Sequence, residues 1–435
     1  MLINLVKSFW RDTVRVIKNG FIQILSGNIL VKMIAFLSSM VIVRLVDKAA
    51  YANLTYANNL YSYLGLLSGL GMPLAMIRYC TAAKSREKDK AYFLFGLKAG
   101  GAFELALALI LCITVCFIDL PFPKARFYTL LLGLTTFLSF LVTMLQSYNR
   151  AHLDYNAHAK IGVVNAATVC VASIIFVYLF GVVGSVIGRY VSLIISILFC
   201  WFVTRKKFPS DAKADRLTGQ EKKEYIGLGF TLMLSNFFSS VMPINESFLV
   251  NNIIQDEIVT ANFKVAGMIP EQLLLFSGAI TVYFFPIFAG MSDPKKILRK
   301  SVKVGVGTAV LIFSIAAAGM ATSPLVIQLI YGSKYADAIP VSYLLWFMRA
   351  LNAGVRVVPL NILSAIGHHK FNAKLSGISC IVHVVLDYFF IKTMGILGVA
   401  YVTTFIYLIT GIVAWIYLVY VCKHNKIGKR VGDKA

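Results

Sequence analysis

The sequence predicts an all-α integral membrane protein, with twelve transmembrane helices arranged as two six-helix bundles. Hydrophobic residues make up 58% of the chain and charged residues only 14%. With a mean hydropathy of +0.77, such a chain cannot cover itself with a polar surface, so lipid must be its main solvent. Twelve apolar stretches are long enough to cross a bilayer, and features of the first six recur in the second six.

The recurrence is clearest between residues 51–79 and 260–288, which share an early Ala-Asn pair and several later residues at one constant offset. Later in each half, a Gly-x-x-Gly pattern at 181–184 returns at 395–398. Chance identities would not keep a register, so the halves are predicted to be copies of one fold. Because each copy holds an even number of spans, the repeat should be parallel, with a pseudo-two-fold axis along the membrane normal.

The order of charged and apolar runs divides the chain into five predicted parts. They are an interfacial or cytoplasmic N-terminal segment at 1–20, an N-terminal six-helix lobe at 21–204, a cytoplasmic linker at 205–224, a C-terminal six-helix lobe at 225–422 and a basic cytoplasmic tail at 423–435. Basic residues at helical spacing in the first part favour an amphipathic helix on the inner leaflet, with an ordered arm as the alternative.

Each lobe contains six apolar runs of spanning length. In the first lobe the spans are predicted at 21–45, 51–79, 92–117, 125–148, 159–180 and 183–204. In the second lobe they are predicted at 225–250, 258–289, 301–330, 338–366, 370–392 and 396–422. Glycine and proline residues inside the second, eighth and tenth spans should interrupt those helices.

The basic residues give the predicted orientation. Lysine and arginine number 42 against 19 acidic residues, for a net charge of +23. The main basic clusters fall on one side when the N-terminus is placed in the cytoplasm, as the positive-inside rule requires. Both termini are therefore predicted to be cytoplasmic. We expect this charge to face anionic lipid, and we expect no nucleic-acid partner.

No signature of catalysis is present in the sequence. It contains no Walker A motif, no Rossmann glycine fingerprint and no H-E-x-x-H pattern. The seven cysteines lie in or beside apolar runs and are expected to be buried thiols. We therefore expect no catalytic residue, no metal and no cofactor, and a transporter in place of an enzyme.

Basic side chains inside the spans are the main candidates for binding. A charged group in a span costs roughly 2.5 to 3.5 kcal/mol, so it should face protein or water. Each candidate shares one helix face with other polar groups, which predicts a common cationic lumen. For any single base, a static interhelical ion pair is the alternative. The predicted binding set is Lys32, Arg189, Lys264, Arg349 and Arg356, supported by Asn28, Ser192 and Asn352.

Carboxylates in or near the spans are candidates for ion coupling. A carboxyl group in a partly dry lumen can carry a proton. Glu271 is the first choice because of its predicted depth, and Glu104 is the second. Asp387, one helical turn after a histidine, and Glu246 complete the set. A proton or a sodium ion is the expected coupling ion.

Two segments carry a resemblance to a known family. They are SGLGMPLAMIRY at 68–79 and VVLDYFFIKTMGILGVAYVTT at 384–404. Together with the duplicated six-span lobes, they resemble the polysaccharide transporter branch, the Wzx-type flippases, of the multidrug/oligosaccharidyl-lipid/polysaccharide (MOP) exporter superfamily. The resemblance covers nearly the full length of the chain.

The resemblance implies a function as well as a fold. It implies translocation of a polyprenyl-pyrophosphate-linked oligosaccharide from the cytoplasmic to the outer leaflet of the bacterial cytoplasmic membrane, for assembly of O-antigen, capsule or exopolysaccharide. It also implies the lipid bilayer, a polysaccharide polymerase and the chain-length machinery as partners. A cationic lumen suits this cargo, because each charge-assisted hydrogen bond to a pyrophosphate contributes about 1.5 to 3 kcal/mol.

Three alternatives remain beside this reading. An ion-coupled multidrug exporter of the same superfamily should present an acidic lumen. Lipid II flippases of the same superfamily typically have fourteen spans, whereas this chain has room for twelve. A membrane-embedded polysaccharide polymerase or ligase usually carries a large external loop with catalytic groups, whereas the external loops here are a few residues long.

Overall fold

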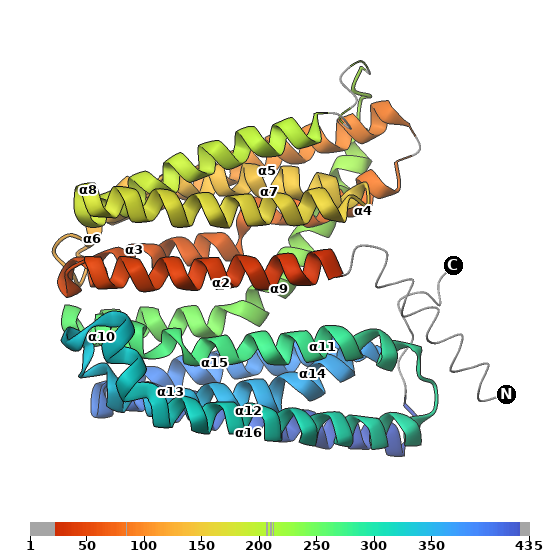
Figure 1. The fold of residues 1–435 in the computed structure, drawn as a ribbon. Helices are drawn as coiled ribbons and strands as arrows, with labels where there is room; N and C mark the ends of the chain where they lie inside the picture. The colour runs from red at the N-terminus through yellow and green to blue at the C-terminus, as the bar shows by residue number, and fades with distance from the viewer. Residues whose placement is uncertain (1–21, 84, 206–207, 209–210, 212, 427–435) are drawn as a thin grey trace. The chain divides into compact units, whose positions relative to one another are not determined.

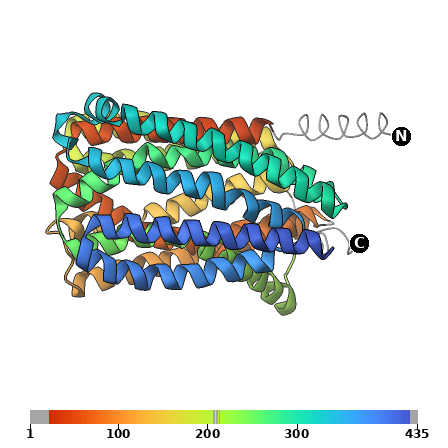
Figure 2. The same ribbon diagram turned by 90° about the horizontal axis from the view of Figure 1, so that it is seen from below.

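The computed structural model describes residues 22–83, 85–205, 208, 211 and 213–426. Over these residues the chain is helical, with short turns and no strand. It packs as two compact units, Met1–Phe237 and Phe238–Ala435. Within each unit the helices run alongside one another (Figures 1 and 2). The predicted all-α membrane fold is therefore confirmed.

The first unit is built mainly from long apolar helices. Its elements are α2 (Ile22–Leu45), α3 (Lys48–Leu66), η2 (Ser68–Gly71), α4 (Met72–Thr81), α5 (Arg86–Phe117), α6 (Ala125–Leu131), α7 (Thr135–Ala151), α8 (Tyr155–Thr204) and the first part of α9 (Gly219–Ile254). Helices α4, α5, α7 and α8 pack around the fully buried Phe140, Tyr148 and Tyr225. Because lipid is as apolar as these side chains, such packing stabilises the unit mainly through close van der Waals contact.

The second unit is also built from helices joined by short turns. After the rest of α9 it contains α10 (Glu257–Met268), η3 (Pro270–Gln272), α11 (Leu273–Gly290), α12 (Pro294–Tyr331), η4 (Ser333–Tyr335), α13 (Ala338–Leu351), η5 (Asn352–Arg356), α14 (Val357–Ala365), α15 (His369–Met394) and α16 (Ile396–Lys423). Its largest core lies among α11, α12, α14 and α16.

Seven helical stretches of the described chain are long and apolar enough to cross a membrane. They are Lys48–Thr81, Arg86–Phe117, Ala125–Ala151, Asn156–Thr204, Pro294–Tyr331, Lys370–Met394 and Ile396–Lys423. The fourth of these holds two predicted spans. The other four predicted spans coincide with α2, α9, α10 to α11 and α13 to α14. The predicted N-terminal segment at 1–20 and most of the tail at 423–435 lie outside the described residues.

The predicted duplication is visible in backbone geometry. Gly181 has φ 60° and ψ −142°, and Gly395 has φ 60° and ψ −138°. This region is essentially restricted to glycine, so both halves turn sharply at the same point of the repeat. A Cβ added to Gly184 or Gly398 would lie 1.8 Å or 2.2 Å from a carbonyl oxygen of the preceding helix. The Gly-x-x-Gly pattern therefore makes one tight helix-to-helix turn in each unit.

Helix caps also occur at equivalent positions of the two halves. The carboxylate of Asp47 accepts hydrogen bonds from two backbone N–H groups and caps α3, and Asp256 caps α10 in the same way. Such caps satisfy donors that the first helical turn leaves free. The two residues are separated by the offset that relates 51–79 to 260–288.

The tenth span contains a π-helical turn, η5, between α13 and α14. Pro359 lies three residues after this turn and has no N–H to donate to the preceding turn of the helix. The break in hydrogen bonding is accommodated by the wider turn, a feature that often accompanies functional sites. It places Arg349 just before the turn and Arg356 at its end.

Candidate functional site

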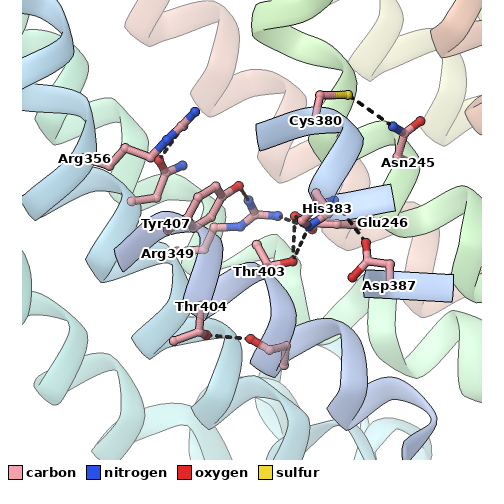
Figure 3. Close-up of polar contacts among 12 residues, drawn as sticks. Asn245, Glu246, Arg349, Arg356, Cys380, His383, Asp387, Thr403, Thr404 and Tyr407 are labelled. Carbon is pink, nitrogen blue, oxygen red and sulfur yellow. Dashed lines mark hydrogen bonds and ion pairs between the residues drawn. The ribbon is translucent and has the colours of Figure 1, made fainter. Parts of the chain in front are cut away.

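A buried polar cluster lies in the second unit, where apolar side chains would be expected (Figure 3). Four helices supply its members: α9, α13, α15 and α16. Every member has at most 8% of its surface exposed. The cluster consists of Glu246, Arg349, His383, Asp387, Thr403 and Tyr407.

An ion pair joins α9 to α13 in this cluster. Nη2 of Arg349 lies 3.5 Å from Oε2 of Glu246, and Nη1 of Arg349 donates a hydrogen bond of 3.4 Å to the hydroxyl of Tyr407. Arg349 was predicted to bind substrate in the lumen. The structure gives it a carboxylate partner, which matches the static-pair alternative in this conformation.

Thr403 connects this ion pair to α15. Its hydroxyl donates to Oε1 of Glu246 at 3.3 Å and lies 2.8 Å from Nε2 of His383. On the other side of the ring, Nδ1 of His383 lies 3.1 Å from Oδ2 of Asp387, one helical turn further along. A continuous polar chain therefore crosses the apolar interior from Asp387 to Arg349.

Arg356 differs from Arg349 in its partners. Its Nη1 donates to Oδ1 of Asn352 at 3.2 Å, and its guanidinium lies 5.2 Å from the ring centre of Tyr407. Among the ion pairs of the described chain, none joins Arg356 to an acid. Neutral and aromatic partners orient the guanidinium and leave its charge uncompensated.

The first unit contains a polar cavity of about 340 Å³. It lies among α2, α3, α7 and α8, and its walls combine amide and hydroxyl groups with apolar side chains. The polar lining consists of Ser39, Asn58, Ser139, Asn165, Ser173, Ser185 and Arg189. Its volume falls at the lower end of the range typical of small-ligand sites, roughly 300 to 1,000 Å³.

Arg189 supplies the cationic group of this cavity. Its Nη1 donates a 2.8 Å hydrogen bond to Oδ1 of Asn58, a neutral partner. No acid of the described part of the chain forms an ion pair with it. A guanidinium that is half-buried in an apolar lobe without a counter-ion favours an anion in the same cavity.

The other predicted binding residues take different positions. Lys32 has an exposed side chain and Lys264 is half-buried. Ser192 is fully buried and lies 2.9 Å from the hydroxyl of Thr168, so it packs between the arms of α8. Asn352 orients Arg356. The side chain of Asn28 lies outside the described residues. Convergence of the five bases on one lumen stays a prediction.

The predicted coupling carboxylates also separate into different environments. Glu271 lies in η3 with an exposed side chain, because the helix breaks there. Glu104 is 1% exposed, and its Oε2 accepts a 2.8 Å hydrogen bond from the backbone N–H of Gly69. Glu246 and Asp387 belong to the buried cluster.

Sequence reasoning gave no role to four residues that complete these sites: His383, Thr403, Tyr407 and Asn58. The histidine one helical turn before Asp387 was noted in the sequence, but the spacing did not show that the two side chains meet. The others owe their roles to contacts between helices far apart in the sequence, which spacing alone does not reveal.

Comparisons with known proteins decide the family. A family model described as polysaccharide biosynthesis protein matches residues 41–340, which is more than half of the chain. The chain belongs to this family. The resemblance drawn from the two segments is confirmed at the family level, and the chain is a multi-pass membrane protein with the fold of MOP-type transporters.

Relatives and structural neighbours agree with that assignment. The uncharacterized membrane protein MJ1068 of Methanocaldococcus jannaschii is 24% identical over 321 residues, which cover 72% of this chain and 62% of the archaeal protein. An inward-facing multidrug resistance MATE family transporter of the MOP superfamily superposes with a TM-score of 0.70 at 17% identity, covering 93% of this chain and 99% of that one.

A second structural neighbour is a MOP superfamily transporter from Pyrococcus furiosus. It superposes with a TM-score of 0.61 at 17% identity, covering 94% of this chain and 96% of that chain. That protein is described as having a binding pocket of reverse polarity that suggests a different function. At these identities the neighbours show the fold of this polysaccharide biosynthesis family member.

Proposed function

We propose that this protein is a flippase that moves a polyprenyl-pyrophosphate-linked oligosaccharide from the cytoplasmic to the outer leaflet of the bacterial cytoplasmic membrane. The observation that carries the proposal is the cavity of the first unit, where Arg189 is bound to neutral Asn58 and has no acidic partner in the described chain. A pyrophosphate supplies the missing negative charge, and amide and hydroxyl groups on the walls match sugar hydroxyls.

Arg356 gives the second unit a similar feature. The guanidinium of Arg356 is oriented by Asn352 and by the ring of Tyr407. Neither partner is an anion, so the group can still bind one. In our proposal each unit offers one arginine without an acidic partner to the anionic cargo, Arg189 in the first unit and Arg356 in the second. Roles in binding for Lys32, Lys264 and Arg349 stay predictions. The transported product is then used by a polysaccharide polymerase and its chain-length machinery.

A multidrug exporter of the same superfamily is the second candidate, because a MATE family transporter shares the fold. Organic cations require acidic or aromatic walls. The cavity of the first unit is lined by arginine, amide and hydroxyl groups, one aromatic ring (Tyr51) and no carboxylate. The transporter from Pyrococcus furiosus, with its pocket of reverse polarity, is a precedent within this fold for a pocket whose charge differs.

Deletion of the gene tests the proposal in cells. We expect a lipid-linked oligosaccharide to accumulate on the inner leaflet, and the wild-type gene to clear it. Arg189→Ala should fail to clear it, whereas Lys392→Ala, at an exposed position near the end of α15, should clear it at equal protein level. If Arg189→Ala clears the lipid-linked oligosaccharide fully, the cavity no longer supports the proposal. If the deletion strain accumulates no such lipid, the proposed function is refuted.

A further inference from the structure

Arg189 is the charged residue among those that line the cavity of the first unit, and its partner is an amide. Its Nη1 atom donates a 2.8 Å hydrogen bond to Oδ1 of Asn58, which lies on α3, 131 positions earlier in the chain. A guanidinium carries donors and no acceptor, so the atom of Asn58 that faces it must be the oxygen. The orientation of this amide is therefore fixed by its partner.

The nitrogen end of the same amide stays available to a ligand. Asn58 lines the cavity, and its Nδ2 atom donates to no group of the described chain. Apart from the bond to Asn58, the guanidinium of Arg189 makes no hydrogen bond with the described residues. Anionic oxygens accept hydrogen bonds from amide and guanidinium donors alike. Asn58 and Arg189 together therefore present neighbouring N–H donors to an anion.

Both residues belong to helix faces that line the cavity. On α3, Tyr51, Leu54 and Asn58 follow one another at spacings of three and four residues, which places them on one face. On α8, Arg189 lies one turn after Ser185, which also lines the cavity. The hydrogen bond between Asn58 and Arg189 is therefore part of the cavity wall, where a ligand can reach it.

The second unit shows the other kind of partner for an arginine inside a lobe. Arg349 lies 3.5 Å from a carboxylate oxygen of Glu246, and this ion pair offsets its charge. Arg356 donates to the amide oxygen of Asn352 at 3.2 Å instead. A carboxylate holds a guanidinium more strongly than an amide does. If Asn58 served only to hold α3 against α8, an aspartate of the same shape would do so better.

We infer that Asn58 is a specificity-determining residue of this cavity, because it orients Arg189 without neutralising it. Its oxygen holds the guanidinium, its nitrogen adds a second donor, and neither atom contributes a negative charge. The group that fits is a diphosphate, whose oxygens accept hydrogen bonds and carry the opposite charge. The inference rests on the proposed function and deepens it, since it names the residue that sets the charge preference of the site.

Substitution by aspartate separates this role from a structural one. Asn58→Asp keeps the shape of the side chain, gives Arg189 an ion-pair partner and removes the Nδ2 donor. Asn58→Ala also removes the donor but leaves the charge of the arginine uncompensated. A residue that sets the charge preference should therefore bind anions better as alanine than as aspartate. A residue that only holds two helices together should tolerate aspartate better than alanine.

The first test measures binding of inorganic pyrophosphate to the purified full-length protein by isothermal titration at fixed salt. Wild type should bind, and Arg189→Ala should bind at least about tenfold more weakly, which assigns the binding to this cavity. Asn58→Asp should bind at least about tenfold more weakly than Asn58→Ala, since a charge-assisted contact is lost. Asn156→Asp adds the same charge at an exposed position in the first turn of α8 and should bind like wild type.

Thermal unfolding of the same variants supplies the second readout. Asn58→Asp should unfold at a temperature no lower than that of Asn58→Ala, because the arginine gains a partner. Weaker binding at undiminished stability is a result that a purely structural role does not produce. If Asn58→Asp binds pyrophosphate as tightly as Asn58→Ala, the inference is overturned. A lower unfolding temperature for Asn58→Asp would also overturn it, since the ion pair with Arg189 would then not form.

A transport assay separates the inference from the proposed function. In vesicles that contain a polyprenyl-pyrophosphate-linked oligosaccharide, Asn58→Asp should flip the lipid at least about tenfold more slowly than Asn58→Ala. If wild type flips the lipid and both variants flip it equally fast, the inference fails and the function stands. If wild type binds pyrophosphate but does not flip the lipid, the function fails and the role of Asn58 in anion binding stands.

Discussion

The carboxylate of Glu104 accepts a 2.8 Å hydrogen bond from the backbone N–H of Gly69. Gly69 lies in η2, where the second span changes direction and three successive residues have positive φ. Glu104, on α5, therefore fixes a broken helix of the same unit. This contact gives Glu104 a role in stability. Its role as the second coupling acid stays a prediction.

Removal of this carboxylate should destabilise the protein. Glu104→Ala leaves the backbone N–H of Gly69 buried without a partner, which typically costs about 1 to 3 kcal/mol. Glu104→Gln keeps an acceptor and should cost less. Thermal unfolding in detergent measures both variants. An Ala variant as stable as the Gln variant would show that Glu104 does not hold the break.

The turn glycines should respond alike in both halves. Alanine at Gly181 or Gly395 must adopt a backbone conformation that only glycine reaches easily, at a cost of about 1 to 3 kcal/mol. Gly377, inside α15 with open space at its Cβ position, is the matched control, and its alanine variant should be neutral or slightly stabilising. Equal unfolding temperatures for all three variants would contradict this account.

For the buried Glu246–Arg349 ion pair we expect a large interaction energy in a double-mutant cycle on stability. Glu246→Gln or Arg349→Met alone leaves one charge buried without its partner, which typically costs about 3 to 5 kcal/mol. The double variant should recover much of this loss, because no unpaired charge remains. A double-mutant cycle on thermal stability checks the prediction. Additive losses would mean that the two side chains act independently.

A half-buried ion pair between Lys88 of α5 and Glu221 of the predicted linker gives a pH dependence. Lys88 donates a hydrogen bond to Glu221 and lowers the pKa of that carboxyl from its ordinary 4.5 to about 2. Because the folded pKa is depressed, the stabilisation is complete above about pH 4.5 and is lost as pH falls toward 2. Lys88→Met should flatten the acid side of the stability profile. An unchanged profile would show that the pair contributes nothing.

Much of the fold could be predicted from the sequence, because a membrane-spanning helix is recognised by the length and hydrophobicity of its segment. The repeat was predicted from matched residues, and the shared geometry of Gly181 and Gly395 confirms it. Glu246 and Asp387 were among the predicted coupling acids. Glu271, the first choice among these acids, lies in η3 with an exposed side chain, and its coupling role stays a prediction.

The hydrogen-bond partners of the predicted residues could not be predicted from their spacing in the sequence. Arg349 contacts Glu246 of α9 and Tyr407 of α16, each more than fifty positions away in the chain. Arg189 finds Asn58 across 131 positions. Helix periodicity shows which residues share a face, while the rotation of each helix against its neighbours decides which faces meet.

The central claim concerns the cargo, and flipping by purified protein in vesicles tests it most directly. Wild-type protein should move a polyprenyl-pyrophosphate-linked oligosaccharide from one leaflet to the other, and Arg189→Ala should slow this movement at least about tenfold, equivalent to the loss of one charge-assisted contact. Arg189→Lys should retain part of the rate. Vesicles in which wild type and Arg189→Ala flip the lipid equally fast, or in which wild type does not flip it at all, would contradict the account.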